Sequence, residues 1–317
     1  MDLFSGQGGG TPVTPDAPHV LVLVDGSSYI FRAYHALPHM SNAAGLTTNA
    51  LRGYISMLKK TLDAYPSAYA AVVMDPVGGT FRHDLYDAYK ANRPPTPEDL
   101  REQFPYIEPL TDAFGVPVVR VEGVEADDVI ATLAVRGRAA GLEVVIASGD
   151  KDLMQLVGGG ISMVDTMRDR TWDPAAVEEK FGVPPEGVGE VLAIMGDSAD
   201  NIPGVKGIGA KGATALIQQF GTLEQVYARL DEIEKPRTRK LLEESREMAL
   251  LSRRLVALKE DVELPDGFDW LCPREKDHAT LIPLLEELEF RTMIKSIGAP
   301  PPAAAATRVE AEAEGEA

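Results

Sequence analysis

Three short apolar runs in the first half of the chain are each followed closely by an aspartate, and this pattern constrains the fold more than any other feature. The runs and their aspartates are Val20–Val24 with Asp25, Ala70–Met74 with Asp75, and Glu143–Ala147 with Asp150 and Asp152. A continuous apolar run of strand length is typical of a strand buried on both faces of a parallel sheet. Helical patterns separate the runs, over Asn49–Ala64, Glu98–Phe114 and Glu125–Ala140. We therefore predict an α/β domain with a mostly parallel sheet.

A further acidic cluster opens the last of these helices. Glu125, Asp127 and Asp128 follow another short apolar run, Val116–Val121. Because parallel strands end at one edge of a sheet, segments distant in the chain would deliver all these carboxylates to that edge. A single acid at such a position is commonly a turn or helix cap. Capping explains a convergence of acids poorly, because so many carboxylates could not stay ionised together without cations.

The residue types in this cluster indicate which cation it would hold. The chain's five histidines and its one cysteine, Cys272, do not lie at ligand spacing near these acids. Carboxylate ligands alone favour a hard ion, Mg²⁺ or Mn²⁺. There are more acids than one such ion uses, so we expect two or more ions, the arrangement that suits displacement at phosphorus. The residues by themselves thus predict metal-dependent hydrolysis of phosphodiester bonds.

The overall composition is that of an ordinary globular protein, and its charge opposes a nucleic-acid partner. The formal net charge is −18, whereas phosphate binding normally leaves a basic footprint. No disulfide framework is possible, which fits a cytoplasmic location. We expect no signal peptide and no membrane span, and we expect disordered tails over 1–18 and 300–317.

Residues 77–103 differ in character from the flanking segments. Phe81–Asn92 is compatible with a helix that carries one stripe of basic and aromatic residues: Arg82, Tyr86, Lys90 and Arg93. Such a stripe beside a metal site suits gripping a phosphate chain while stacking on bases. A solvated charged face is an equally good interpretation of the stripe alone.

The pattern after Asp152 is mainly helical, over 173–181, 187–195, 213–220, 223–230, 237–251 and 281–297, with a last strand expected over Arg254–Leu258. Asp197 and Asp200 lie three apart and are candidates for a second, looser metal site. A glycine-rich stretch, 204–213, precedes a helix, so its backbone N–H groups could bind phosphate. Lys206 and Lys211 would add charge there. A plain helix–helix turn is the alternative, and a dinucleotide fingerprint is rejected because no strand precedes the glycines.

The motifs occur in an order that resembles the 5′-nuclease domain of bacterial DNA polymerase I, a member of the flap endonuclease family. The resemblance covers Val20–Ala299 and rests on these motifs: Val24-Asp25-Gly26 with Phe31-Arg32-Ala33, Phe81-Arg82-His83 through Tyr89-Lys90-Ala91-Asn92-Arg93, Glu125-Ala126-Asp127-Asp128, Ser148-Gly149-Asp150-Lys151-Asp152, and Gly196-Asp197 through Asp200-Asn201 to Gly209.

The resemblance implies a PIN-like core over 19–185 with a helical arch over 77–103. It also implies a helical DNA-binding region over 186–299, whose helix-two-turn-helix at 204–213 holds duplex backbone and a monovalent cation, K⁺. The metal carboxylates carry over onto Asp25, Asp75, Glu125, Asp127, Asp128, Asp150, Asp152, Asp197 and Asp200. Lys90 would contact the scissile phosphate, with Arg82 and Arg93 as helpers. Further DNA contacts are expected at Arg32, Tyr89, Gly204, Val205, Lys206, Gly207, Ile208, Gly209 and Lys211.

The predicted function is therefore a structure-specific 5′-nuclease that acts on DNA with 5′ flaps, nicks or RNA–DNA primer ends. The catalytic ions would be held by Asp25, Asp75, Glu125, Asp127, Asp150 and Asp152. We expect a monomer. Two alternatives stay open: a non-catalytic DNA junction-binding module, and a PIN-type ribonuclease acting on single-stranded RNA. The polymerase region of the family is not in this chain, so the sequence fits a free-standing nuclease or a fragment equally.

Overall fold

The core of the protein is a mostly parallel sheet, as the apolar runs predicted. The computed structural model describes residues 19–297, so the two predicted tails lie outside the described part. Six strands are ordered β3-β2-β1-β4-β5-β6; β1 to β5 are parallel, and β6 pairs antiparallel with β5. The strands are β1 (Val20–Asp25), β2 (Tyr69–Val73), β3 (Val118–Val119), β4 (Glu143–Ala147), β5 (Ile161–Asp165) and β6 (Arg170–Trp172).

The continuous apolar character of the strands reflects burial on both faces. In β1, Leu21 and Leu23 belong to the core on one face and Val22 and Val24 to the core on the other, and all four are fully buried. Alternating side chains point to opposite faces of a strand, so a strand covered on both sides needs apolar residues at every position.

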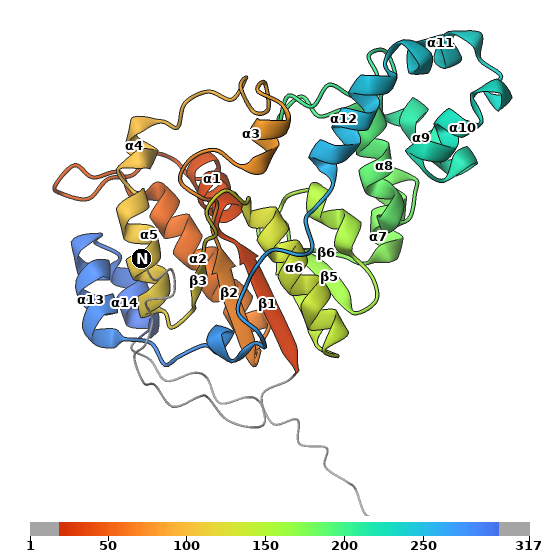
Figure 1. Cartoon of the computed structure of the whole chain (residues 1–317). Coiled ribbons are helices and arrows are strands. Elements are labelled where there is room, and N and C mark those ends of the chain that lie inside the picture. Colours follow the sequence, from red (N-terminus) through yellow and green to blue (C-terminus); the bar gives the residue numbers. More distant parts are fainter. Residues whose placement is uncertain (1–18, 298–317) are drawn as a thin grey trace, which may run out of the picture.

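Helices cover both faces of the sheet (Figure 1). One face carries α1 (Gly26–Ala36), α2 (Asn49–Ala64) and α5 (Phe104–Ala113), and the other carries α6 (Ala126–Ala139). The last two helices, α13 (His278–Glu287) and α14 (Arg291–Ile297), return to the first face beside α5. They do not join the helical region, where the sequence-based domain boundaries had placed them.

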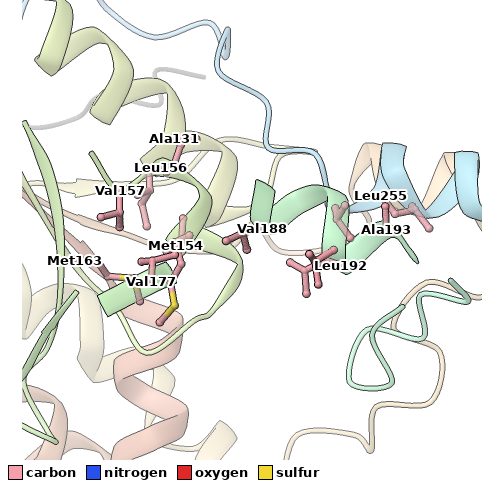
Figure 2. Close-up of a cluster of buried hydrophobic side chains, with 14 of the residues drawn as sticks. Ala131, Met154, Leu156, Val157, Met163, Val177, Val188, Leu192, Ala193 and Leu255 are labelled. Carbon is pink, nitrogen blue, oxygen red and sulfur yellow. The ribbon is translucent and has the colours of Figure 1, made fainter. Parts of the chain in front are cut away.

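A helical region extends from the face of the sheet that carries α6. Its helices are α7 (Pro174–Phe181), α8 (Pro185–Met195), α9 (Ala210–Phe220), α10 (Leu223–Ala228), α11 (Pro236–Glu244) and α12 (Arg246–Val256). Short 3-10 turns occur at η1 (Asp152–Leu156), where the region meets the sheet, at η2 (Leu230–Glu232) within the region, and at η3 (Asp269–Leu271) beside β2. Figure 2 shows how this region is joined to the sheet: Met154 and Leu156 of η1 pack between α6 and α8 in one continuous core. Because η1 begins at Asp152, the same packing fixes the position of that carboxylate.

Residues 77–103 do not contain the helix over Phe81–Asn92 that the sequence favoured. They contain only α3 (Phe81–Leu85) and α4 (Glu98–Arg101), with turns and loops between. Thr80 and His83 form a capping box that starts α3, but Tyr86 is extended and Lys90 has a left-handed backbone (φ 55°), so the helix cannot continue. Pro105 divides the predicted helix 98–114, because proline at a helix start lacks the N–H that continuation would need.

Other elements of the structure also differ from the secondary structure that the sequence predicts. The expected strand at Arg254–Leu258 is wrong, since α12 continues to Val256. Helix α1 was not predicted, and neither were β5 and β6. Within residues 19–297, no helix combines the length and the hydropathy that crossing a bilayer would require.

Candidate active site

Asp25 is the innermost acid of the carboxyl edge of the sheet. It is the last residue of β1 and caps α1, accepting the N–H of Ser28 at 2.8 Å and the hydroxyl of Ser148 at 2.6 Å. Burial raises the pKa of Asp25 to about 7, against the lowering effect of the Ser148 hydrogen bond, and the charges of Asp75 and Asp150 raise it further. The carboxyl ends of β1 and β4 are thus joined through Ser148.

Asp75 and Asp127 lie at the junction of β2 with α6. Asp75 accepts the N–H of Ala126 at 2.9 Å, which holds the first turn of α6 against the end of β2. Burial raises the pKa of Asp127 well above its usual range, and Asp150, Asp25, Asp75 and Asp152 raise it in that order. The negative charges of these four aspartates therefore all act on Asp127.

Asp150 and Asp152 complete the group. Asp150 accepts the N–H of Asp152 at 2.9 Å. Burial and the neighbouring Asp150 raise the pKa of Asp152 to about 7. The Oδ1 atom of Asp152 is buried without a hydrogen bond, and the ammonium of Lys151 lies 3.6 Å from it. A buried carboxylate oxygen with a free lone pair, amid other acids, fits a hard divalent cation.

The structure gathers these acids without preassembling a coordination sphere. Within residues 19–297, no three His, Cys, Asp or Glu side chains converge at the geometry of a metal site. Four other predicted ligands, Glu125, Asp128, Asp197 and Asp200, are engaged by basic side chains of the protein itself.

Glu125 is the centre of one such engagement. Its Oε1 accepts the ammonium of Lys90 at 2.7 Å, and its Oε2 accepts the hydroxyl of Tyr89 at 3.0 Å. Tyr89 is buried and also donates to Asp200 at 3.2 Å. In this structure Tyr89 therefore cannot reach DNA as predicted, and it positions the two acids instead.

Arg82 and Asp128 are bound to each other, which corrects the prediction for both. Arg82 forms a bidentate ion pair with Asp128 at 2.6 and 2.8 Å, and both side chains are buried. Arg82 also donates to the carbonyl groups of Leu255 and Ala257. Asp128 also accepts the N–H of Lys259. The pair joins α3, α6 and the end of α12, and leaves Arg82 without access to DNA and Asp128 without access to the acidic edge.

The outer acids, Asp197 and Asp200, are likewise paired. Asp197 accepts the ammonium of Lys151 and the N–H of Ala199, and Asp200 accepts the guanidinium of Arg93. Lys90 Nζ lies 3.9 Å from Asp200. The two acids lie next to the inner group, since both raise the pKa of Asp152.

Sequence analysis missed several residues that shape the site. Ser148 and Lys151 were noted only as parts of a motif, although a lysine between two acids was a visible signal. Arg32 was predicted to contact DNA, but its guanidinium forms an ion pair with Asp165 at 2.7 Å. Asp165 was unrecognised because β5, at whose end it lies, was not predicted.

The glycine-rich stretch forms the turn between α8 and α9. Val205 and Ile208 are buried and anchor it, and Gly204 donates its N–H to Ser252 at 2.9 Å. The exposed residues of the stretch are Lys206, Gly207, Gly209, Ala210, Lys211 and Gly212. The stretch predicted to contact phosphate therefore contains buried residues that anchor the turn and exposed residues that a ligand can reach.

A parallel sheet with a crowded acidic edge, joined to a helical region with an exposed glycine-rich turn, defines the class of metal-dependent nucleases. The comparison with known families makes this specific. Residues 20–182 match the N-terminal resolvase-like domain of 5′-3′ exonucleases, and residues 183–279 match their C-terminal SAM fold. The chain belongs to the 5′-3′ exonuclease family, which confirms the resemblance stated from the motifs.

Individual relatives agree with this. The chain is 47% identical to DNA polymerase I of Pseudomonas aeruginosa over 284 residues, which are 87% of this chain and 31% of that protein. It is 34% identical to a 5′-3′ exonuclease of Aquifex aeolicus over 279 residues, which are 87% of this chain and 94% of that protein. The chain thus spans about a third of the polymerase relative and nearly all of the exonuclease.

One solved structure shares the fold over most of this chain. The T5 5′-exonuclease with bound zinc ions superposes with a TM-score of 0.64 at 27% identity, over 84% of this chain and 98% of that one. The likeness extends through the sheet and the helical region together.

Proposed function

We propose that this chain is a divalent-metal-dependent 5′-3′ exonuclease and flap endonuclease that hydrolyses DNA with 5′ flaps, nicks or RNA–DNA primer ends. The observation that carries the proposal is the acidic edge, where burial and mutual repulsion raise the pKa values of Asp25, Asp127 and Asp152 together. Such a group of carboxyls is costly unless a cation neutralises it. Relatives with this family's domains and a metal-bound structural neighbour support the same activity.

Asp25, Asp75, Asp127, Asp150 and Asp152 would hold Mg²⁺ or Mn²⁺, with two or more ions. A bound divalent ion activates water and stabilises the charge that develops on phosphorus. The protein's own contribution is to place the acids: Ser148 fixes Asp25, and Asp75 fixes the start of α6. Asp197 and Asp200 would serve an outer ion once their basic partners move.

Lys90 is placed to meet the phosphate. Its backbone N–H donates to the carbonyl of Asp200 at 2.9 Å, which anchors the loop, while its ammonium lies on Glu125 at the rim of the site. If Glu125 turned to a bound cation, the Lys90 ammonium would be free to neutralise charge on the scissile phosphate. Arg93, half-exposed on the same loop, would help.

The exposed glycine-rich turn would grip duplex backbone through its N–H groups, Lys206 and Lys211 would add charge, and the turn would hold a monovalent cation, K⁺. Such contacts set the register of the cut without reading bases. We propose that the chain acts in the cytoplasm as a monomer, in replication and repair. The activities of the longer polymerase relatives beyond this region are not assigned to it.

The test is cleavage of a 5′-flap duplex, labelled at each end in separate samples, with Mg²⁺ and with EDTA. Wild type should cut near the flap junction only with Mg²⁺, and single-stranded RNA should stay intact. Asp150→Asn with Asp152→Asn should abolish cutting and retain binding. The matched control, Glu275→Gln with Glu286→Gln, removes two exposed acids far from the edge and should cut normally. Full activity of the Asp150/Asp152 variant would refute the assignment.

A further inference from the structure

Two basic side chains lie against one buried indole where the sheet meets the helical region. The guanidinium of Arg170 lies 3.8 Å and the ammonium of Lys180 lies 4.6 Å from the centroid of the Trp172 ring. Trp172 is 6% exposed, whereas Arg170, in β6, and Lys180, in α7, are exposed residues. The ring therefore holds two like charges close together at the surface by cation–π contact.

Arg168 adds a third positive charge in the turn between β5 and β6. The backbone N–H of Arg168 donates to the Asp165 carboxylate at 3.1 Å. The other acid of the turn, Asp169, is paired with Lys60. No ion pair found within residues 19–297 includes Arg168, Arg170 or Lys180. We call these three residues the Trp172 patch.

The charges of the patch repel one another. Burial, then Arg170, Lys151 and Arg168, lower the pKa of Lys180. Among these neighbours only Asp150 acts in the opposite direction on Lys180. In a chain with a net charge of −18, a group of described cations without an ion pair is a local exception. A surface of this kind attracts a polyanion.

The patch adjoins the acidic edge. Because β5 is parallel to β4, the turn after Asp165 lies at the same edge of the sheet as Asp150. Lys180 Nζ lies 3.5 Å from Met154 Sδ in η1, the turn that begins at Asp152. Figure 1 shows that α7 then leads on to α8 and the helical region.

We propose that the Trp172 patch binds the phosphodiester backbone of the DNA substrate beside the bond to be cut, an inference that rests on the proposed nuclease function. Arginine and lysine are the usual partners of phosphate oxygens. Stacking on Trp172 restrains Arg170 and Lys180 before the ligand arrives, which lowers the entropy lost on binding. The patch would position the strand and take no part in the chemistry.

The test compares two variants with the same change in charge. The patch variant is Arg168→Gln, Arg170→Gln and Lys180→Met. The control is Arg52→Gln, Arg291→Gln and Lys295→Met, exposed positions on α2 and α14. Dissociation constants for a labelled 5′-flap duplex are measured by fluorescence anisotropy in EDTA at several salt concentrations.

The patch variant should bind roughly 10- to 100-fold more weakly, and its slope of log Kd against log salt should fall by about 2–3, since each lost phosphate contact removes about 0.9. The control should keep the wild-type slope. Arg168→Gln alone leaves the Trp172 ring contacts intact and should lower the slope by about 1 with an unchanged melting temperature.

The outcomes separate the two proposals. If wild type cuts flaps while the patch variant binds like the control, the patch inference is overturned and the nuclease function stands. If the patch variant cuts poorly at an unchanged salt slope, the patch is structural and the inference is again overturned. If wild type neither binds nor cuts DNA, both proposals are overturned.

Discussion

Arg82 and Asp128 form a bidentate ion pair, at 2.6 and 2.8 Å, inside the protein, while the adjacent acid Asp127 points into the acidic edge. Two neighbouring carboxylates of α6 thus have opposite effects on the stability of the protein, one favourable and one unfavourable. Asp128 is neutralised by a buried guanidinium, whereas Asp127 is surrounded by other acids.

This contrast predicts opposite effects of the same substitution at neighbouring positions. Asp128→Asn removes the bidentate partner of the buried Arg82 and leaves it only the longer contact with Glu125 Oε2, at 3.3 Å. It should therefore lower the free energy of unfolding by about 2–3 kcal/mol. Asp127→Asn removes a repelled charge and should stabilise the metal-free protein by about 1 kcal/mol or more. Urea unfolding in EDTA measures both. Equal effects of the two substitutions would show that the ion pair is not what distinguishes them.

The metal-free protein should lose stability as the pH rises. The folded pKa values of Asp25 and Asp152 are about 7, above the value near 3.9 of an unfolded aspartate. A raised folded pKa means that the stabilising contribution is complete below about pH 4 and is lost as the pH rises through about 7. In EDTA the melting temperature should therefore fall by about 5 °C or more between about pH 5 and about pH 8, if ~2 kcal/mol is lost.

Added Mg²⁺ should raise the melting temperature more at the higher pH, where these carboxylates are ionised and ready to bind it. The Asp25→Asn and Asp152→Asn double variant is the control and should show a flatter pH profile. A melting temperature in EDTA that rises over this interval, with the double variant behaving like wild type, would contradict the prediction.

The sheet and its acidic edge could be predicted from the sequence because both depend on local pattern. Buried parallel strands such as β1 and β4 need apolar residues throughout, and their ends place Asp25 and Asp150 at one edge. Helix α1 was missed because Gly26-Ser27-Ser28 resembles a turn, whereas the Asp25 side chain caps a helix there. The pattern around 81–92 is helical, but contacts of Tyr89 and Lys90 with Glu125 and Asp200 override it.

Pairings between distant residues could not be predicted, because they depend on the assembled fold. The partners of Arg82 and Arg32 lie 46 and 133 residues further along the chain. The family resemblance, and for Arg82 also the basic stripe, made both arginines candidates for DNA contact. Only the geometry shows that each is held by an acid of the protein.

Substitution of Lys151 tests whether this lysine blocks metal binding at the outer acids. Its ammonium is bound to Asp197 and lies 3.6 Å from Asp152 Oδ1, where it competes with a divalent ion. Lys151→Met should tighten binding of Mn²⁺ roughly tenfold at the outer acids, equivalent to about 1.4 kcal/mol, measured by calorimetry without DNA. Lys151→Arg keeps the charge and should bind Mn²⁺ like wild type. Weaker binding by Lys151→Met would mean that the lysine organises the acids instead of blocking them.

Two glycines of the turn between α8 and α9 should respond differently to the same added methyl group. Gly204 has a left-handed backbone (φ 58°), and a Cβ there would lie 2.4 Å from the nitrogen of Gly196. Gly204→Ala should therefore cost about 2 kcal/mol or more of stability. A Cβ on Gly209 meets no atom within 4 Å, and this residue lies exposed at the start of α9. Gly209→Ala should keep the fold to within about 1 kcal/mol.

If the exposed N–H groups of this turn contact phosphate closely, the methyl group of Gly209→Ala should nonetheless weaken binding of duplex DNA several-fold. Thermal unfolding and anisotropy on the same samples separate the two effects. The control is Gly79→Ala, because a Cβ on Gly79 would meet no atom within 4 Å and its backbone is not left-handed. Gly221→Ala is unsuitable, because Gly221 has a positive φ. Gly79→Ala should change neither stability nor duplex binding. Unchanged DNA binding by Gly209→Ala would indicate that the turn anchors α9 without approaching the phosphate backbone.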